Sequence, residues 1–342
     1  MITAVLLGLL ILPVSAMDIT APAVPESGAA LMPAEADSFG EGVLEILRDA
    51  VGYFRPDLKE AARVCVGILV VSMLVAVVSV FPGHSKAVTE LTGTVLTAGL
   101  LLQSSNSLIS LGAETVEQIS EYGKLLLPVM STALAAQGGV TSSAALYAGT
   151  AIFDAFLSSL ISKLLVPMIY LYLALATAAG AVGESLLKKM GDTVKWAMTW
   201  GLKIVLYVFT GYIGITGVVS GTTDAAALKA AKLTISGVVP VVGGILSDAS
   251  EAVLVGAGVV KNAAGIYGLL AILAVWIGPF LRIGAHYLML KVTEEVCGVF
   301  DVKSVKGLLH DFSAAMGILL AMTGTVCLML LISTVCFMKG VG

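Results

Sequence analysis

The sequence is poor in charge. Only 12% of its 342 residues are charged, whereas a soluble domain carries about 25%. The mean hydropathy is +1.00 and 58% of the residues are hydrophobic, so the chain cannot present an ordinary water-facing surface. Several apolar runs of about 18 residues or more carry no charge, which is typical of transmembrane helices. The composition excludes a soluble globular protein and predicts an all-α, polytopic helical membrane protein.

Motifs for catalysis, metal binding and nucleic-acid binding are also absent. No run of Lys or Arg resembles a nucleic-acid contact surface, and no HExxH, GxSxG or P-loop pattern occurs. The three histidines are scattered. The four cysteines have no CxxC spacing, which favours apolar packing over a metal or redox role. We therefore expect no enzymatic activity, no catalytic residue, no cofactor or metal, and no nucleic-acid partner.

The first 63 residues differ from the rest of the chain. Residues 1–16, MITAVLLGLLILPVSA, predict a signal peptide with a small-residue cleavage site. They lack a basic n-region, so an uncleaved anchor and a misassigned start remain alternatives. Residues 17–63 predict a flexible extracytoplasmic segment that ends in an amphipathic helix from residue 41, lying on the membrane or packed on its own protein. The polytopic membrane domain is expected over 64–342.

Eight apolar stretches are candidates for membrane spans. Five follow the expected pattern, at 64–81, 164–187, 202–220, 264–287 and 314–338. Three are interrupted by polar or acidic residues, at 93–111, 141–162 and 241–260. The positive-inside rule places the N-terminal side of the first span in the cytoplasm, whereas a cleaved signal peptide places it outside. We favour the signal peptide, because acidic residues crowd the same segment.

Two parts of the chain resemble each other in the order of their elements. Pro128 and Pro240 are 112 residues apart, as are Pro167 and Pro279. In each part a proline-headed segment precedes a proline-containing span, a basic amphipathic loop and a final span. We interpret these parts as internal repeats, with a chance match as the alternative because their identity is low. The repeats lie near 125–221 and 237–334.

Both repeats interrupt an apolar run with a proline and a pair of glycines. A break in a membrane helix frees backbone N–H and C=O groups, which must face protein or a wet cavity rather than lipid. We therefore expect interrupted helices whose breaks line a polar cavity. The residues of these breaks are Pro128, Gly138, Gly139, Pro240, Gly243 and Gly244. The alternative is that both prolines start ordinary helices at the membrane interface.

A few ionisable residues fall inside the apolar runs. A charged group in hydrocarbon costs about 2.5–3.5 kcal/mol on insertion scales, so such groups usually face the bundle interior and pair. Arg282 lies mid-span, and we expect Asp154 to be its counter-ion. The functional interpretation is a polar path or gate, and the alternative is a structural buried pair. The intramembrane charges are Asp154, Asp248, Glu251 and Arg282.

Two basic segments bear on the topology. They contain Lys188 and Lys195 in the first repeat, and Lys303 and Lys306 in the second. Both favour the cytoplasm, so an even number of crossings must separate them. We therefore expect 241–260 to be a re-entrant or interfacial segment. Labelling of the two basic segments from opposite sides would instead favour an inverted repeat.

Three segments carry more specific motifs. They are LLLPVM…AAQGGVTS at 125–142, VPVVGGILSDASEAV at 239–253 and VVKNAAGIYG at 259–268. These motifs resemble the stage III sporulation protein AE family. The resemblance implies a multi-pass protein of the mother-cell membrane around the forespore. It implies partnership with other proteins of the stage III A operon and, through them, with the forespore stage II protein Q. It implies no catalytic residue and no cofactor.

These observations lead to two functional hypotheses. The first is a permease-like conduit component of the channel or secretion-like complex that the resemblance implies. Any energising ATPase would be a separate chain, since no nucleotide motif occurs. The second is a structural membrane anchor, or assembly platform, with no transport path of its own. Lipid is a partner in both, and small-residue stretches such as ATAAGAVG at 176–183 allow helix contacts within one chain or in a homo-oligomer.

Overall fold

The computed structural model describes residues 22–33, 38–81, 85–136, 140–215, 263–300 and 302–339. Regular structure within these ranges is entirely helical, which confirms the predicted all-α class. The elements are α2 (Glu26–Ala29), α3 (Phe39–Val80), α4 (Lys86–Ala136), α5 (Val140–Leu160), the π-helix η1 (Ile161–Leu165), α6 (Val166–Val182), α7 (Ser185–Ile215), α10 (Ala263–Val299) and α11 (Lys303–Lys339).

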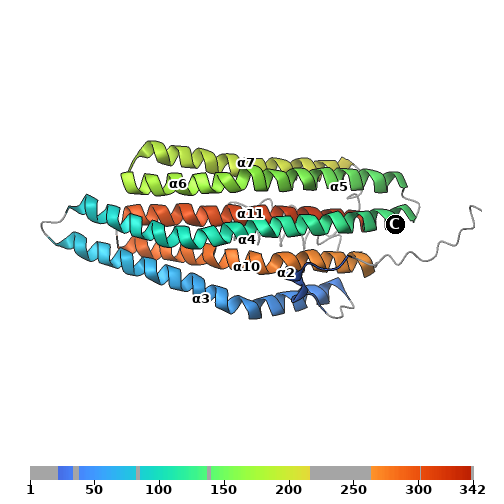
Figure 1. Cartoon of the computed structure of the whole chain (residues 1–342), viewed down its shortest axis with the longest axis horizontal. Helices are drawn as coiled ribbons and strands as arrows, with labels where there is room; N and C mark the ends of the chain where they lie inside the picture. Colours follow the sequence, from blue (N-terminus) through green and yellow to red (C-terminus); the bar gives the residue numbers. More distant parts are fainter. Residues whose placement is uncertain are drawn as a thin grey trace, which may run out of the picture.

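Long helical rods lie side by side, and successive rods run in opposite directions (Figure 1). Helices α3, α6 and α10 end, and α4, α7 and α11 begin, at one end of the bundle, on the left of Figure 1, which we call the hairpin end. Helix α4 ends and α5 begins at the opposite end. The described part of the chain is therefore an up-and-down bundle of antiparallel helices.

Helix α11 is the central element of this bundle. Its sequence carries no charge from Phe312 to Met338, so every face of the helix can lie against apolar surroundings, whether protein or lipid. The helix packs against α4, α5, α6, α7 and α10. Its most apolar window is completely buried inside the chain. The other helices therefore separate α11 from lipid.

Five helices are long and apolar enough to cross a membrane, which supports the expected polytopic membrane protein. They cover Phe54–Val80, Val88–Ala133, Ser143–Val182, Gly265–Val299 and Lys303–Met338. At 1.5 Å per residue, the 51 residues of α4 extend about 77 Å, more than twice the hydrocarbon thickness of about 30 Å. The longest rods must therefore project beyond the hydrocarbon layer or tilt strongly within it.

Several expected spans merge into longer helices. Segments 141–162 and 164–187 were expected as separate spans, but they form one rod from Val140 to Val182, joined by the π-turn of η1. Likewise, α3 is continuous across residue 63, so the amphipathic segment and the first span are a single helix. Short apolar windows locate the apolar parts of a rod. They do not reveal that the backbone stays helical between them.

Helix α3 begins where its sequence provides a cap. The Ser38 hydroxyl accepts a hydrogen bond from the Glu41 N–H at 3.3 Å, as in the S-x-x-E capping pattern. The other end of the helix is apolar and largely exposed on the bundle surface. Val70, Met73 and Leu74 are each more than half exposed. Because the surrounding solvent at this end is lipid, such exposure costs no hydrophobic free energy.

The expected helix break at Pro128 is not present. Pro128 lies inside α4, which continues to Ala136. A proline within a membrane-spanning helix is tolerated when neighbouring groups satisfy the freed carbonyl. Helix α4 ends at Ala136 and α5 begins at Val140, and the expected break residues Gly138 and Gly139 lie outside the described residues.

The second predicted break also lies outside the described residues. It comprises Pro240, Gly243 and Gly244, and the acidic residues Asp248 and Glu251 lie in the same undescribed stretch. The expected re-entrant segment at 241–260 therefore stays a prediction, as do the signal peptide over 1–16 and the two internal repeats. In the described parts, α6–α7 and α10–α11 are both helical hairpins whose second helix begins with basic residues.

The tight α6–α7 connection depends on a glycine. Gly183 has a φ of +75°, the left-handed conformation that ends many helices, and its N–H donates to the Ala179 carbonyl at 2.8 Å. The chain then reverses at once into α7. This turn places Lys188 beside Lys303, because both lysines line one groove at the hairpin end. The two basic segments therefore lie at the same end of the bundle, as the sequence predicts.

We predict that cysteines introduced at Lys188 and Lys303 react with a membrane-impermeant maleimide from the same side of the membrane. A cysteine at Val140, at the opposite end, should react from the other side. The four native cysteines are buried, so they should add little background. Labelling of intact and opened vesicles measures the sidedness, and reaction of positions 188 and 303 from opposite sides would contradict the bundle.

We also predict that Gly123→Val destabilises the contact between α4 and α11. A Cβ at Gly123 would lie 2.8 Å from Leu330 Cδ1, so overpacking should cost about 1–3 kcal/mol. Gly99→Val is the matched control, because a Cβ at this position of the same helix meets nothing within 4 Å. Thermal unfolding of the two variants in detergent measures the difference, and equal midpoints would refute the close packing.

Candidate functional site

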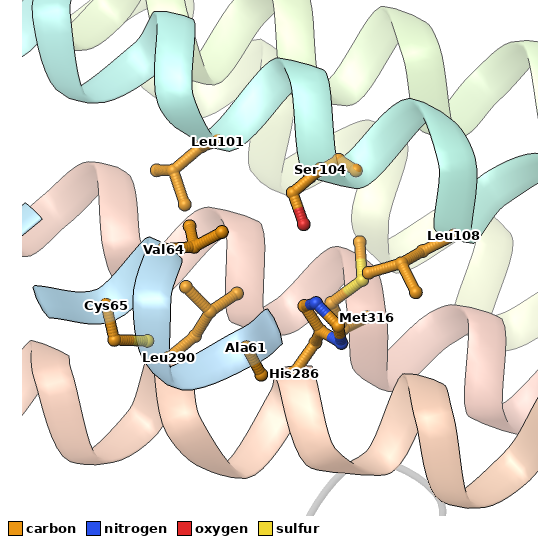
Figure 2. A pocket seen from close by; sticks show the side chains of 10 residues that line it. Ala61, Val64, Cys65, Leu101, Ser104, Leu108, His286, Leu290 and Met316 are labelled. Carbon is orange, nitrogen blue, oxygen red and sulfur yellow. The ribbon is translucent and has the colours of Figure 1, made fainter. Parts of the chain in front are cut away.

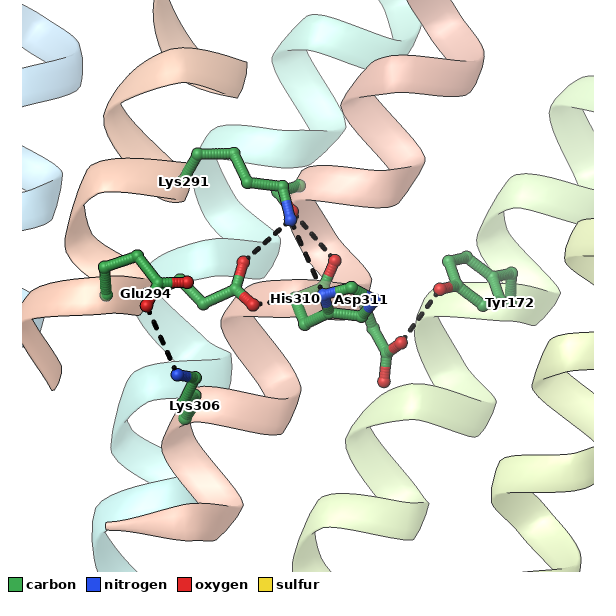
Figure 3. Close-up of polar contacts among 8 residues, drawn as sticks. Tyr172, Lys291, Glu294, Lys306, His310 and Asp311 are labelled. Carbon is green, nitrogen blue, oxygen red and sulfur yellow. Dashed lines mark hydrogen bonds and ion pairs between the residues drawn. The ribbon is translucent and has the colours of Figure 1, made fainter. Parts of the chain in front are cut away.

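A layer of charged and polar side chains crosses the bundle near the hairpin end (Figure 3). We call it the polar layer. Helix α10 contributes acids and a lysine at helical spacing, α11 contributes three residues from its first turns, and α6 contributes a tyrosine. The members are Tyr172, Lys291, Glu294, Glu295, Lys306, His310 and Asp311.

The Glu294 carboxylate is the centre of the polar layer. Lys291 Nζ donates to Glu294 Oε2 at 2.9 Å, and His310 Nδ1 lies 3.0 Å from Glu294 Oε1. The Glu294 side chain is only 7% exposed. A carboxylate this deeply buried requires partners on both oxygens, since desolvation without them is very costly. The α10–α11 hairpin supplies these partners, one from each helix.

Two further contacts extend the layer sideways. Lys306 Nζ pairs with Glu295 Oε2 at 3.4 Å, and this pair is largely exposed. On the other side, the buried Tyr172 hydroxyl donates to Asp311 Oδ1 at 2.9 Å. The second contact joins α6 to α11. The polar layer therefore ties three helices together, with its buried part between them.

The composition of the neighbouring helix α3 indicates how deep in the membrane the polar layer lies. The Ser72 hydroxyl lies 3.3 Å from Cys297 Sγ, so the charged end of α10 packs beside the C-terminal part of α3. At this level α3 carries no charge, from Val64 to Phe81, and much of its surface is exposed and apolar. The polar layer therefore lies alongside a stretch that has the composition of a membrane span.

A groove opens beside the polar layer at the hairpin end. It lies between α6, α7 and α11 and has a volume of about 350 Å³. Asp311 lines it, so the groove adjoins the polar layer, and Glu184, Lys188 and Lys303 line it as well. Small residues such as Gly180 and Gly307 complete the wall. This volume lies within the range of about 300–1,000 Å³ that small-molecule sites occupy.

Arg282 belongs to a second polar group, between α10 and α3. Its Nε lies 3.4 Å from Asp57 Oδ1, and its Nη2 lies 3.4 Å from Glu60 Oε2. The Arg282 carbonyl also lies 3.0 Å from His286 Nδ1. The counter-ions of Arg282 are therefore on α3, and the expected pairing with Asp154 is wrong. Asp57 and Glu60 lie in the segment that was predicted to be an amphipathic helix, on the membrane or packed on its own protein. Sequence reasoning therefore did not consider them as partners of Arg282.

His286 lines a small enclosed cavity between α3, α4, α10 and α11 (Figure 2). The cavity volume is about 10 Å³, which is room for about one water molecule. Its polar lining consists of His286, Ser104 and Ser105. His286 Nε2 is buried and has no hydrogen-bond partner among the described residues. A bridging water would satisfy this nitrogen.

Asp154 is buried elsewhere, between α5 and α4. Its Oδ2 accepts a hydrogen bond from the Ser120 hydroxyl at 2.7 Å, and its residue exposure is 2%. Its Oδ1 has no partner among the described residues. The fold thus places Asp154 and Arg282 in separate surroundings, and their expected position inside the membrane stays a prediction.

A comparison with known protein families identifies the chain. The model of the stage III sporulation protein AE family matches residues 34–340, which is most of the sequence. The chain belongs to the stage III sporulation protein AE family. The family assignment confirms the resemblance seen in the sequence, and it makes this chain a sporulation-related membrane protein.

One curated member of the family aligns with part of this chain. The stage III sporulation protein AE of Bacillus subtilis (strain 168) is 23% identical over 184 residues. The alignment covers 54% of this chain and 46% of that protein, so the matched region spans about half the length of each. No solved structure matches the chain. No solved structure therefore offers a comparison for the polar layer of this AE family member.

Sequence reasoning missed the polar layer. His310 and Asp311 lie in a segment that was interpreted as a basic amphipathic loop, and Glu294 was not singled out, whereas the structure places all three on α10 and α11. One signal was available. Lys291 and Glu294 are three residues apart, and Lys306 and His310 are four apart, so each set lies on one helix face. Among the described residues, no three His, Cys, Asp or Glu side chains are arranged to hold a metal ion.

We predict that Lys291→Met lowers the stability of this AE family member by about 1–3 kcal/mol, because the buried Glu294 carboxylate loses a charged donor. Lys306→Met is the matched control. Its partner Glu295 is 75% exposed, so its loss should cost less than about 1 kcal/mol. Thermal unfolding in detergent compares the two variants. Equal destabilisation by both changes would contradict a buried role for Glu294.

Proposed function

We propose that this AE family member is a multi-pass subunit of a sporulation complex that links the mother cell to the forespore. In this proposal it resides in the mother-cell membrane around the forespore and acts as a permease-like conduit component. Its partners are other proteins of the stage III A operon and, through them, the forespore stage II protein Q. The family supports the membrane and sporulation setting, and the polar layer supports a path for polar material.

The observation that carries the conduit role is the depth of the polar layer. Glu294 is nearly inaccessible, yet its helix packs beside the charge-free stretch of α3 through the Ser72–Cys297 contact. Ionisable groups at such a level are costly and in membrane proteins typically mark ion or substrate pathways. The groove beside Asp311 connects this level to the hairpin end. Together they form the start of a polar route along α11.

The route must follow the outside of α11 rather than the centre of the bundle. Helix α11 is packed on all sides, and the cavity between α3, α4, α10 and α11 holds only about 10 Å³. The groove, by contrast, opens to the surface between α6, α7 and α11. A conduit of this kind would be completed by a neighbouring subunit, either a partner protein or a second copy of the chain.

The second candidate is a structural anchor that moves nothing. The same packing of α11 favours it, because a solid core suits a platform on which other subunits assemble. The exposed apolar faces of α3 and α4 at the hairpin end would then serve as docking surfaces in the membrane. The two candidates differ in whether the polar layer is needed for passage or only for stability.

A paired substitution in sporulating cells separates the two candidates. Glu294→Gln with His310→Gln removes the buried carboxylate and the half-exposed imidazole that contacts it, with limited change of side-chain size. The conduit proposal expects normal membrane insertion and normal co-purification of partner subunits. It also expects late forespore gene expression to fall to the level of a strain lacking the chain. The matched control is Glu295→Gln with Lys306→Gln, which changes the exposed pair and should leave expression unchanged.

The opposite results identify the anchor. Normal forespore gene expression with the Glu294/His310 double variant would refute the conduit and favour the platform. Loss of partner co-purification together with expression would also favour the platform, because the polar layer would then act through assembly. Protein abundance in the membrane fraction is measured in parallel, so that a loss of expression is interpreted only for chains that insert normally.

A further inference from the structure

The groove between α6, α7 and α11 holds two cations without an ion-pair partner. Lys188 begins α7 and Lys303 begins α11, and both line the groove. Neither forms an ion pair with another described residue. The other lysines of this end that belong to the polar layer are paired, Lys291 with Glu294 and Lys306 with Glu295. These two cations thus lie together in a groove of about 350 Å³, which is large enough for a ligand.

The backbone adds positive potential at the same place. Helix α7 starts at Ser185 and α11 starts at Lys303, and their first turns meet at the groove, where Ser185 and Ser304 lie in the lining. The first N–H groups of a helix have no intrahelical acceptor, and the helix dipole makes this end favourable for anions. Two helices of 31 and 37 residues direct these ends toward one space. The serine hydroxyls are further donors for an oxyanion.

The groove lining holds two acids beside its two lysines. Asp311 already accepts a hydrogen bond from Tyr172, and it interacts electrostatically with His310, Lys195 and Lys188. Glu184 lies at the α6–α7 turn, and Asp192 lies near enough to Tyr172 to interact with it electrostatically. The side-chain charges of the lining therefore balance, and the N-terminal ends of α7 and α11 together with the hydrogen-bonded state of Asp311 favour a ligand with negative charge over a cation.

The surroundings of the groove suit a lipid. Val182 and Leu186 flank the α6–α7 turn and are 68% and 61% exposed. They provide apolar surface directly beside the cationic lining, so a headgroup in the groove would have room for acyl chains next to it. Gly307 leaves the wall open, because a Cβ there would meet nothing within 4 Å. Basic pockets between membrane helices are typical sites for anionic headgroups.

We propose that this groove binds the phosphate-bearing headgroup of one anionic phospholipid, held by Lys188, Lys303 and the first turns of α7 and α11. The acyl chains lie along Val182 and Leu186. Bound lipid fixes the α6–α7 hairpin against α11 and neutralises the two lysines. Lipid binding itself requires only that the chain resides in a membrane, but the site lies in the groove from which the proposed polar route begins, so bound lipid would occupy that end of the route.

Native mass spectrometry of the full chain in a neutral detergent tests the site. Phosphatidylglycerol and phosphatidylcholine with the same acyl chains are titrated separately. We expect one phosphatidylglycerol per chain to bind with clear preference over phosphatidylcholine. A lysine near a membrane surface contributes about 1 kcal/mol, which is about fivefold in affinity. Lys188→Gln and Lys303→Gln should each weaken binding about fivefold, and the double variant about twentyfold or more.

Two matched controls separate charge from shape. Lys189→Gln makes the same charge change on the neighbouring exposed residue, which does not line the groove, and should leave binding unchanged. Gly307→Leu fills the groove without changing charge and should abolish preferential binding. Gly201→Leu is its control at another open helical position. If circular dichroism shows that the double lysine variant does not fold, the comparison of Gly307→Leu with Gly201→Leu tests whether the lipid binds in the groove.

Several outcomes would overturn the proposal. Equal binding of the two lipids would remove the role of charge, and unchanged binding by a folded double lysine variant or by Gly307→Leu would place the lipid elsewhere. Inorganic phosphate is added in a separate arm. If it displaces phosphatidylglycerol at comparable concentration, the groove is a site for free phosphate, and the assignment to a lipid is wrong. If only phosphatidylglycerol binds, the acyl chains take part as proposed.

Discussion

The burial of α11 by its neighbours is the constraint on which the rest of the structure depends. From Phe312 to Met338 this helix has no charge, and every face of it is covered. In lipid the hydrophobic effect gives no drive for such packing, so close van der Waals contact must hold the helices together. Glycines of α4 at the contact, such as Gly112 and Gly123, allow α11 side chains to approach closely.

That central packing decides where polar groups can lie. The first turns of α11 carry His310 and Asp311, and once the helix is in the centre His310 contacts α10 while half exposed, and Asp311 contacts α6. Glu294 and Tyr172 meet them there, so a partly buried network forms around the charged first turns of the helix. Such networks hold a single arrangement because an unpaired buried charge is far more costly than a paired one. The polar layer, the groove beside it and the proposed lipid site all follow from this placement.

Much of the architecture could be predicted from composition and periodicity, but the joins between elements could not. The apolar windows at 64–81, 264–287 and 314–338 all fall in helices of the bundle. The windows at 141–162 and 164–187 belong largely to one continuous rod, formed by α5, η1 and α6. A lysine at position 163 and a π-turn do not end a helix whose backbone hydrogen bonds are otherwise satisfied. Pro128 was misinterpreted for the same reason. A proline costs one backbone hydrogen bond, and a 51-residue rod packed against neighbours can absorb that loss.

By itself the sequence determined that this protein is helical, membrane-embedded and a member of its family. Those properties depend on composition and on local motifs, which residues close in the chain define. Only the tertiary structure decided which charges meet. Arg282 pairs with Asp57 and Glu60, and Glu294 with Lys291 and His310, whereas the sequence had suggested Asp154 for Arg282. Partners of this kind are separated by up to about two hundred residues in the sequence. The pairing depends on which helix faces lie against each other, and the periodicity within one helix does not encode that arrangement.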